Sequence, residues 1–547
     1  MAWAQTSGAT AGTYLAARAA EAARDLPASA DLYAEALGQD PADPRLLESA
    51  LVANLGLGRL DEARALAVRV VEAGLPSPLA HLTLATHEAQ SGDWRAVLAD
   101  QEAGRQVGPL ADGLGRAWAW MGEGDTEAAL SAFDELATVS GLEPFALTHK
   151  ALALALSGDL AGADAVLSLP DSEGMRQTRR SVLAHAEVLG ALDRRDEALR
   201  LLEVSFGAQA DAPILALRDR LRSEGPFAFT LVASPAEGLA EGYFGIAAAL
   251  ASEDPTHALL YVRAALALNP GEAEAALLAG RLLADLGQPD LAREAYAAVP
   301  PEDPAFAAAE LGRAEVLRGA GEGQAALEVL THLSQDRPDL PDVQAALGDL
   351  LRSLDRPEEA EAAYDRAIEL SPGGAGGLWY LHFTRALARQ IQDDWPAAEA
   401  DLRQALELRP DQPQVLNHLG YTLVDRGEKL SEALRLIEQA VELRPDSGAI
   451  VDSLGWAYFR LGRFPEAVGQ LEKAASLAAT DPVVNDHLGD AYWSVGRERE
   501  ARFQWTRALN LEPLPEEAER IRDKLAEGLD LPVAEETAAL PPESTGG

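Results

Sequence analysis

The chain has 547 residues, no cysteine, and 88 acidic against 46 basic side chains, a formal net charge of −42. Without cysteine, disulfides, thiolate catalysis and cysteine-held metal sites are excluded. The acidic excess disfavours nucleic acid, whose phosphates are bound by clustered Lys and Arg, and it fits either a solvated surface or a field that attracts a basic partner.

The N-terminal residues 1–9 contain Ala2-Trp3-Ala4, an A-x-A pattern of the kind that precedes signal cleavage. We interpret it as the remnant of a removed signal peptide, with Met1 added, and therefore predict a periplasmic protein. A native cytosolic start with chance alanines is the alternative. The sequence has no run of about 18 apolar residues, so no transmembrane segment is predicted.

Residues 10–212 predict an N-terminal array of six degenerate helix pairs at a spacing of about 34 residues. Small residues recur where the two helices of a pair would meet, as at Ala17, Ala63 and Ala151. One pair is too small to bury its own core, so the copies are expected to stack on one another.

The period breaks over residues 213–238. Residues 213–222 predict one helix, and Phe227 to Val232 form a short β-prone run between Gly-Pro and Ser-Pro pairs. Three interpretations follow. The segment is an irregular insert packed on the helices, a joint between two superhelical segments, or a strand offered to a partner.

Residues 239–515 predict eight more regular copies. A capping helix is expected over 516–529 and a disordered tail over 530–547. The spacing between two of these copies is longer than the repeat, and we expect a loop at Gly373–Gly377 to account for the extra residues. The eighth position of each copy is small or apolar, and its residues are Ile246, Gly280, Ala314, Gly348, Ala386, Gly420, Gly455 and Gly489.

The last copies carry the most specific signal. The stretches LGWAYFRLG from Leu454 and LGDAYWSVG from Leu488 lie 34 residues apart and share the Leu-Gly pair, the Tyr and the closing Gly. The glycines after the Leu let paired helices approach closely, and the closing glycines accept the positive φ that ends a helix. This pattern resembles the tetratricopeptide repeat family.

The resemblance implies an all-α fold, a right-handed superhelical α-solenoid of helix-turn-helix repeats. The C-terminal third also resembles exported alphaproteobacterial proteins of this family, which implies an envelope-associated scaffold without known catalysis. In the family, positions 2, 5, 9, 12 and 13 of each first helix point into a concave groove. Carried over, these positions include Asn417, Tyr421, Asp452, Trp456, Phe459, Arg460, Asp486, Asp490 and Trp493.

Aromatic rings mixed with acids at these positions suit an extended peptide with apolar and basic residues. We expect Trp456 and Trp493 to lie side by side as two exposed rings. The alternative is that some of these rings belong to the core between repeats.

Signals for catalysis are weak. The sequence has no H-E-x-x-H, G-x-S-x-G or Walker motif, so no catalytic, cofactor-binding or metal-binding residue is predicted. We interpret His487 as a hydrogen-bonded structural histidine, and Asp486 with Asp490, one helical turn apart, as a solvated carboxylate pair.

The sequence therefore predicts a non-catalytic scaffold in the bacterial cell envelope that binds an unidentified protein or peptide, with envelope complexes as candidate associates. A cytoplasmic adaptor of the same fold is one alternative. An envelope hydrolase or glycan-processing factor that uses groove carboxylates is another.

Overall fold

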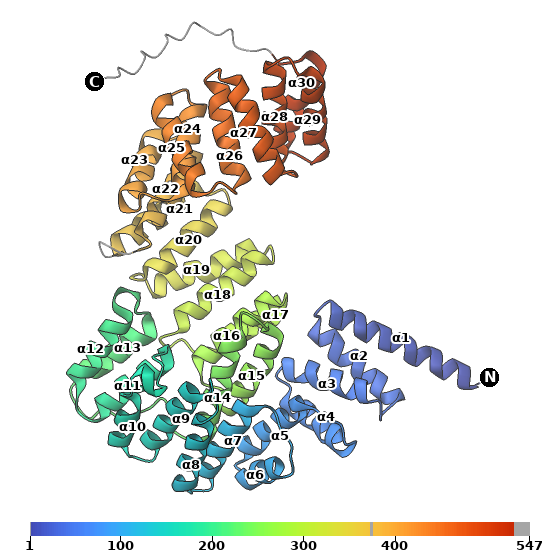
Figure 1. Cartoon of the computed structure of the whole chain (residues 1–547), viewed down its shortest axis with the longest axis vertical. Coiled ribbons are helices and arrows are strands. Elements are labelled where there is room, and N and C mark those ends of the chain that lie inside the picture. The colour runs from blue at the N-terminus through green and yellow to red at the C-terminus, as the bar shows by residue number, and fades with distance from the viewer. Residues whose placement is uncertain (1, 372–375, 530–547) are drawn as a thin grey trace. The chain divides into compact units, whose positions relative to one another are not determined.

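A computed structural model describes residues 2–371 and 376–529. Over these residues the chain forms 30 α-helices and two short 3-10 helices, and no strand (Figure 1). The predicted all-α fold is therefore confirmed. The expected loop at Gly373–Gly377 lies mostly outside the described residues, and the tail at 530–547 lies wholly outside them.

The chain divides into two compact units, residues 1–338 and 339–547. In the first unit, successive helices pair as antiparallel neighbours and the pairs stack along the chain (Figure 1). Its helices are α1 (Ala2–Ala22), α2 (Leu26–Gln39), α3 (Pro44–Gly56), α4 (Leu60–Glu72), α5 (Pro78–Ser91), α6 (Trp94–Glu102), α7 (Pro109–Gly122), α8 (Thr126–Ala137), α9 (Glu143–Leu156), α10 (Leu160–Leu167), η1 (Asp171–Glu173), α11 (Arg179–Ala191), α12 (Arg195–Phe206), η2 (Gly207–Gln209), α13 (Ala212–Arg222), α14 (Pro235–Leu250), α15 (Pro255–Leu268), α16 (Ala273–Asp285), α17 (Pro289–Ala297), α18 (Phe306–Gly319) and α19 (Gly323–Asp336).

The second unit continues the same pattern of paired helices and ends in a single helix, α30. Its helices are α20 (Pro341–Ser353), α21 (Pro357–Leu370), α22 (Leu378–Ile391), α23 (Trp395–Leu408), α24 (Pro413–Asp425), α25 (Leu430–Leu443), α26 (Gly448–Arg460), α27 (Phe464–Leu477), α28 (Pro482–Ser494), α29 (Glu498–Asn510) and α30 (Pro515–Glu527).

The turn inside each pair follows from local backbone chemistry. After α26, Gly462 has φ +73°, and after α28, Gly496 has φ +79°, a conformation that costs glycine little and other residues more. The next helix begins two residues later. Proline at the first turn of many helices fixes where each one starts. The predicted role of these glycines is confirmed.

Small residues at the helix crossings allow the pairs to pack closely. A Cβ built on Gly455 of α26 would lie 2.5 Å from Cγ of Leu471 in α27, and one on Gly489 of α28 would lie 2.4 Å from Cδ1 of Trp505 in α29. Both distances are far below van der Waals contact. The predicted close contacts at these two glycines are therefore confirmed.

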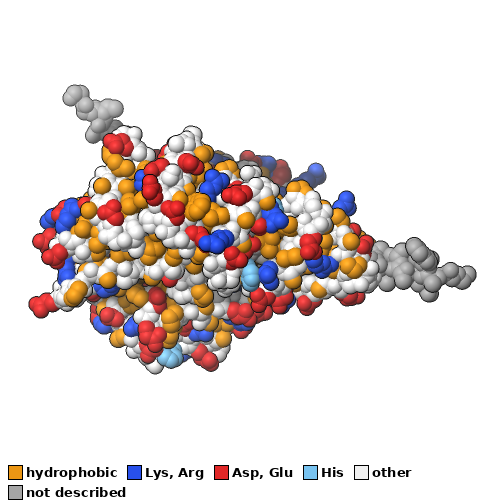
Figure 2. Space-filling view, turned by 90° about the horizontal axis from the view of Figure 1, so that it is seen from below, with side chains coloured by type: hydrophobic (Ala, Val, Ile, Leu, Met, Phe, Trp, Pro, Cys, Tyr) orange, Lys and Arg blue, Asp and Glu red, His pale blue; other side chains and the backbone are white. Residues whose placement is uncertain are grey.

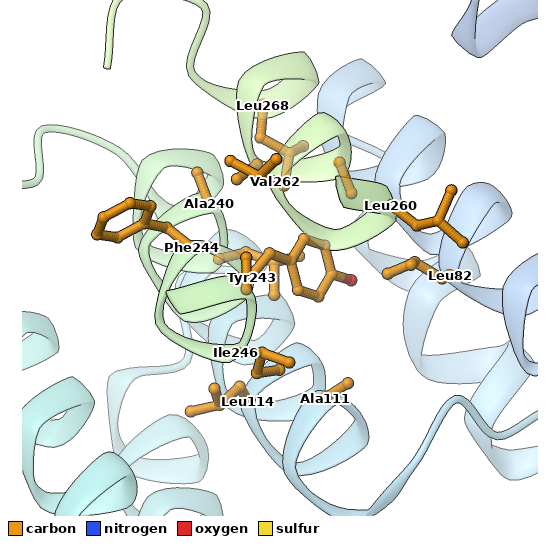
Figure 3. Packing of buried hydrophobic residues seen from close by; sticks show 14 of the residues in the cluster. Leu82, Ala111, Leu114, Ala240, Tyr243, Phe244, Ile246, Leu260, Val262 and Leu268 are labelled. Carbon is orange, nitrogen blue, oxygen red and sulfur yellow. The ribbon is translucent and has the colours of Figure 1, made fainter. Parts of the chain in front are cut away.

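The core of the first unit joins segments that are far apart in sequence. Helix α14 packs on α7 and α9, and α15 packs on α3 and α5. Tyr243 of α14 is 1% exposed, and its ring lies between Leu114 and Leu260, with its hydroxyl toward Leu82 (Figure 3). The first helices of the early pairs are thus covered by later helices of the same unit.

Candidate partner-binding site

The segment between α13 and α14 is extended and packs along α11 in the first unit. The buried carboxylate of Glu187 accepts hydrogen bonds from the backbone N–H of Thr230 at 2.7 Å and of Leu231 at 3.0 Å. The Phe227 ring lies against Gly190, where an added Cβ would be 2.9 Å from it. Of the three interpretations of this segment, these contacts fit an irregular insert packed on the helices.

A buried ionic cluster fastens the same region to later helices. The guanidinium of Arg180 on α11 donates to Glu241 of α14 at 2.7 Å and to Glu274 of α16 at 3.1 Å. Burial opposes the charge on Arg180, but Glu241 outweighs it and raises the arginine's pKa. This face of α11 is therefore occupied by the chain's own segments.

In the second unit, the first helices of three neighbouring pairs form one wall. Helix α24 contacts α26, and α26 contacts α28. Asn417, Asp452 and Asp486 occupy the same position in these three helices, 35 and 34 residues apart. We call this set of helices the C-terminal wall. Its acceptor side chains at that shared position form a row.

At one end of the row, Asp486 and Asp490 bind a lysine from α30. The Lys524 ammonium lies 2.9 and 3.0 Å from the two carboxylate oxygens of Asp486 and 2.6 Å from Oδ2 of Asp490. Trp505 Nε1 donates to the other oxygen of Asp490 at 2.9 Å. The aspartates are 1% and 3% exposed. The expectation of a solvated carboxylate pair is therefore wrong, because α30 folds over both groups.

The lysine was missed from the sequence although a weak signal for it exists. Lys524 is one of only four lysines in the chain and follows Ile521 by three residues, a spacing that puts both on one helix face. Both are buried. A lone lysine on the apolar face of a capping helix indicates a buried carboxylate opposite it.

In the middle of the row, Asp452 is paired with a histidine of the next repeat. His487 Nδ1 lies 2.9 Å from Oδ2 of Asp452, and both side chains are buried. Burial alone would lower the pKa of His487, but the carboxylates of Asp452, Asp486 and Asp490 outweigh it and raise that pKa. The prediction of a hydrogen-bonded structural histidine is confirmed.

Beside this pair lies a cavity of about 220 Å³. Asn417, Tyr421, Asp452 and His487 are among the residues that line it. Within the described part of the chain, Oδ1 of Asn417, Oδ1 of Asp452 and Nε1 of Trp456 are buried and have no hydrogen-bond partner. Buried polar atoms without partners are uncommon and call for a ligand or water. Two of these three belong to residues of the cavity wall.

The repeat pattern is matched independently by family models. Models described as tetratricopeptide repeat match residues 14–78, 249–315, 311–375 and 423–482. The chain contains tetratricopeptide repeats. A TPR repeat-containing protein of Pseudomonas aeruginosa is 29% identical over 190 residues, 34% of this chain and 31% of that relative. The match thus spans about a third of the relative's length.

Solved structures of repeat proteins are similar to the chain at low sequence identity. A chain from a crystallised APC/C hetero-tetramer is 14% identical, with a TM-score of 0.40 over 95% of this chain and 96% of that one. A tetratricopeptide repeat protein from Parabacteroides merdae is 18% identical, with a TM-score of 0.38 over 46% of this chain and 97% of that one.

The aromatic residues of the C-terminal wall are more buried than expected. Trp456 stacks on His487, with ring centroids 4.1 Å apart, and on Phe459 at 5.0 Å. Trp493 packs on Trp505 at 5.4 Å, and a Cβ built on Gly528 would lie 2.3 Å from it. Both tryptophans are partly buried. The expectation of two exposed rings is wrong, because neighbouring repeats and the end of α30 cover much of each ring.

The two remaining residues of the expected groove differ in their surroundings. Tyr421 is partly buried and lines the cavity. Burial, followed by the charges of Asp425 and Asp452, raises the pKa of its hydroxyl. Arg460 is exposed and pairs with Asp425 at 3.2 Å. The chain's own side chains therefore cover the C-terminal wall less completely beside the cavity than beneath α30.

Three further observations concern metal binding, membrane-spanning helices and surface charge. No group of three or more His, Asp or Glu side chains in the described ranges is placed to hold a metal ion. None of the described helices is both long and apolar enough to cross a membrane. On the face shown in Figure 2, acidic side chains are mixed with basic and hydrophobic ones. Charge is thus interspersed over that face of the repeat protein.

Proposed function

We propose that this tetratricopeptide repeat protein is a non-catalytic scaffold that binds an extended segment of a protein partner along the C-terminal wall. The observation that carries the proposal is the cavity beside Asn417 and Asp452, where two buried oxygens have no partner among the described residues. Backbone N–H groups and basic side chains of an extended peptide would supply the missing donors.

The first unit supports the same choice of site. Its α11 face already holds an extended segment, bound through Glu187, and α14 and α15 cover α3, α5, α7 and α9. A partner would have to displace the chain's own contacts there. At the cavity of the C-terminal wall, a partner would instead satisfy polar atoms that lack partners.

Peptide selection tests the proposal. Random peptides of about twelve residues would be displayed on phage and selected against the full chain, and the enriched peptides would be synthesised for fluorescence anisotropy. We expect saturable binding. Trp456→Ala should reduce the binding free energy by about 2 kcal/mol, because a partner side chain would pack against the part of this ring that the C-terminal wall leaves exposed. Val204→Ala, at an exposed residue of α12, is the matched control. A selection without any saturable binder would contradict the proposal.

Location in the cell envelope is a separate part of the proposal. Its support is the A-x-A pattern at Ala2-Trp3-Ala4 and the resemblance to exported repeat proteins. Cell fractionation with an antibody against the protein tests it. We expect recovery with periplasmic markers, whereas recovery only with cytosolic markers would favour the cytoplasmic adaptor.

A further inference from the structure

The contact between α30 and the C-terminal wall shows which chemical group the wall holds. Lys524 inserts its ammonium between two carboxylates of one first helix, at 2.6 to 3.0 Å. The lysine is 8% exposed, so its charge is desolvated and depends on those carboxylates. Within one chain, a shared position of the repeat therefore already acts as an ammonium site.

One repeat earlier, the carboxylate at the equivalent position is contacted by a histidine and, among the described residues, by no Lys or Arg. Asp452 is the counterpart of Asp486 and is 5% exposed. Its Oδ2 contacts His487, and its Oδ1 has no partner among the described residues. Asn417, one repeat further back, adds a second acceptor oxygen without a partner. The row of acceptors thus continues beyond the part that α30 fills.

The surroundings of this cavity favour a cationic ligand. Its lining contains two carboxylates, Asp452 and Asp481, and no Lys or Arg. Its two histidines are already engaged, since His487 contacts Asp452 and His418 contacts Gln390 at 2.6 Å. An ammonium entering the cavity would therefore meet acceptors on two helices and no competing Lys or Arg charge in the lining.

We propose that the cavity receives the side-chain ammonium of a lysine in the partner segment, held by Oδ1 of Asp452 and Oδ1 of Asn417. The contact repeats, one helix pair earlier, the one that Lys524 makes with Asp486. It rests on the proposed function, because the lysine arrives on a bound partner. Two separate acceptors on different helices suit a compact ammonium better than the planar fork of arginine, which matches one bidentate carboxylate.

The test uses the full chain and four randomised heptapeptide libraries that differ only at the central residue. That residue is lysine, acetyl-lysine, arginine or glutamate, and binding is measured by fluorescence anisotropy at low and high salt. We expect the lysine library to bind at least about 10-fold more tightly than the acetyl-lysine library. The advantage should shrink as salt rises.

Two variants locate the contact. Asp452→Asn should remove the lysine advantage, while Glu442→Gln, which takes the same charge from an exposed position on α25, should keep it. Asn417→Asp adds a carboxylate to the cavity wall and should tighten lysine binding by about threefold or more. A gain in affinity cannot come from misfolding, so this variant keeps the test valid if Asp452→Asn loses stability.

The outcomes separate the two proposals. Three results would overturn the lysine site and leave the scaffold function standing. They are equal affinity for all four libraries, a preference for arginine, and a lysine advantage that neither Asp452→Asn nor Asn417→Asp changes. Failure of every library to bind would count against both.

Discussion

The imidazole of His487 and the carboxylate of Asp452 join two successive repeats, with Nδ1 and Oδ2 2.9 Å apart and both side chains buried. The indole of Trp456 lies on the histidine, with ring centroids 4.1 Å apart and an interplanar angle of 14°. The pair therefore forms one edge of the cavity in the C-terminal wall. Because it joins α26 to α28, the charge of His487 affects how these two helices pack.

This pair predicts a pH dependence of stability. The pKa of His487 is raised in the folded chain above its ordinary value of 6.5. The stability that charged His487 contributes is therefore complete below pH 6.5 and is lost as pH rises through the raised folded pKa. Urea unfolding at several pH values from 5.5 to 8.5 measures it, and Asp452→Asn should flatten the curve. If the free energy of unfolding of that variant depends on pH as steeply as in the parent chain, other groups cause the pH dependence.

The helix crossings predict opposite effects for two glycines of one repeat. Gly455→Ala should destabilise by about 1–3 kcal/mol, because the new Cβ would lie 2.5 Å from Leu471. Gly469→Ala on α27 meets nothing within 4 Å and should stabilise the helix by about 0.5–1 kcal/mol. Thermal unfolding of the two variants side by side checks this. Equal shifts would show that crowding at Gly455 is absent.

The buried lysine predicts a large local effect. Lys524→Met would leave Asp486 and Asp490 without the ammonium that neutralises them and should destabilise the end of the second unit by about 3–5 kcal/mol. Lys473→Met, at an exposed position on α27, is the control. Hydrogen exchange of α28 to α30 measures the effect. If both variants exchange alike, the ion pair does not hold α30 in place.

The extended segment of the first unit predicts a protease-sensitive variant. Glu187→Ala removes the acceptor of the Thr230 and Leu231 N–H groups and should destabilise the segment by about 1–3 kcal/mol. Chymotrypsin should then cleave at Phe227 faster than in the parent chain. Glu328→Ala, the same substitution at an exposed position on α19, serves as control. Unchanged cleavage would mean that other contacts hold the segment.

Local features of the fold could be predicted from the sequence because they depend on neighbours in the chain. Gly455 and Leu471 lie in one helix pair, and Gly462 sets the turn between its helices, so period and residue size suffice to predict them. The same holds for the helix found at 212–222.

Long-range contacts could not be predicted in this way. Arg180 meets Glu241 across 61 residues, and Lys524 meets Asp486 across 38. Each contact depends on how a segment outside the regular repeats folds back onto the chain, and the repeat spacing does not predict that. The repeat register predicted the row of groove positions. It did not predict that α30 covers Asp486, so that a partner cannot reach this residue.

The central claim is that the partner binds the C-terminal wall. Hydrogen–deuterium exchange of the full chain, with and without a saturating selected peptide, tests it most directly. The account predicts slower exchange in α24, α26 and α28, with α3, α5, α7 and α9 unchanged because α14 and α15 already cover them. Slower exchange confined to the first unit, with α24, α26 and α28 unaffected, would contradict it.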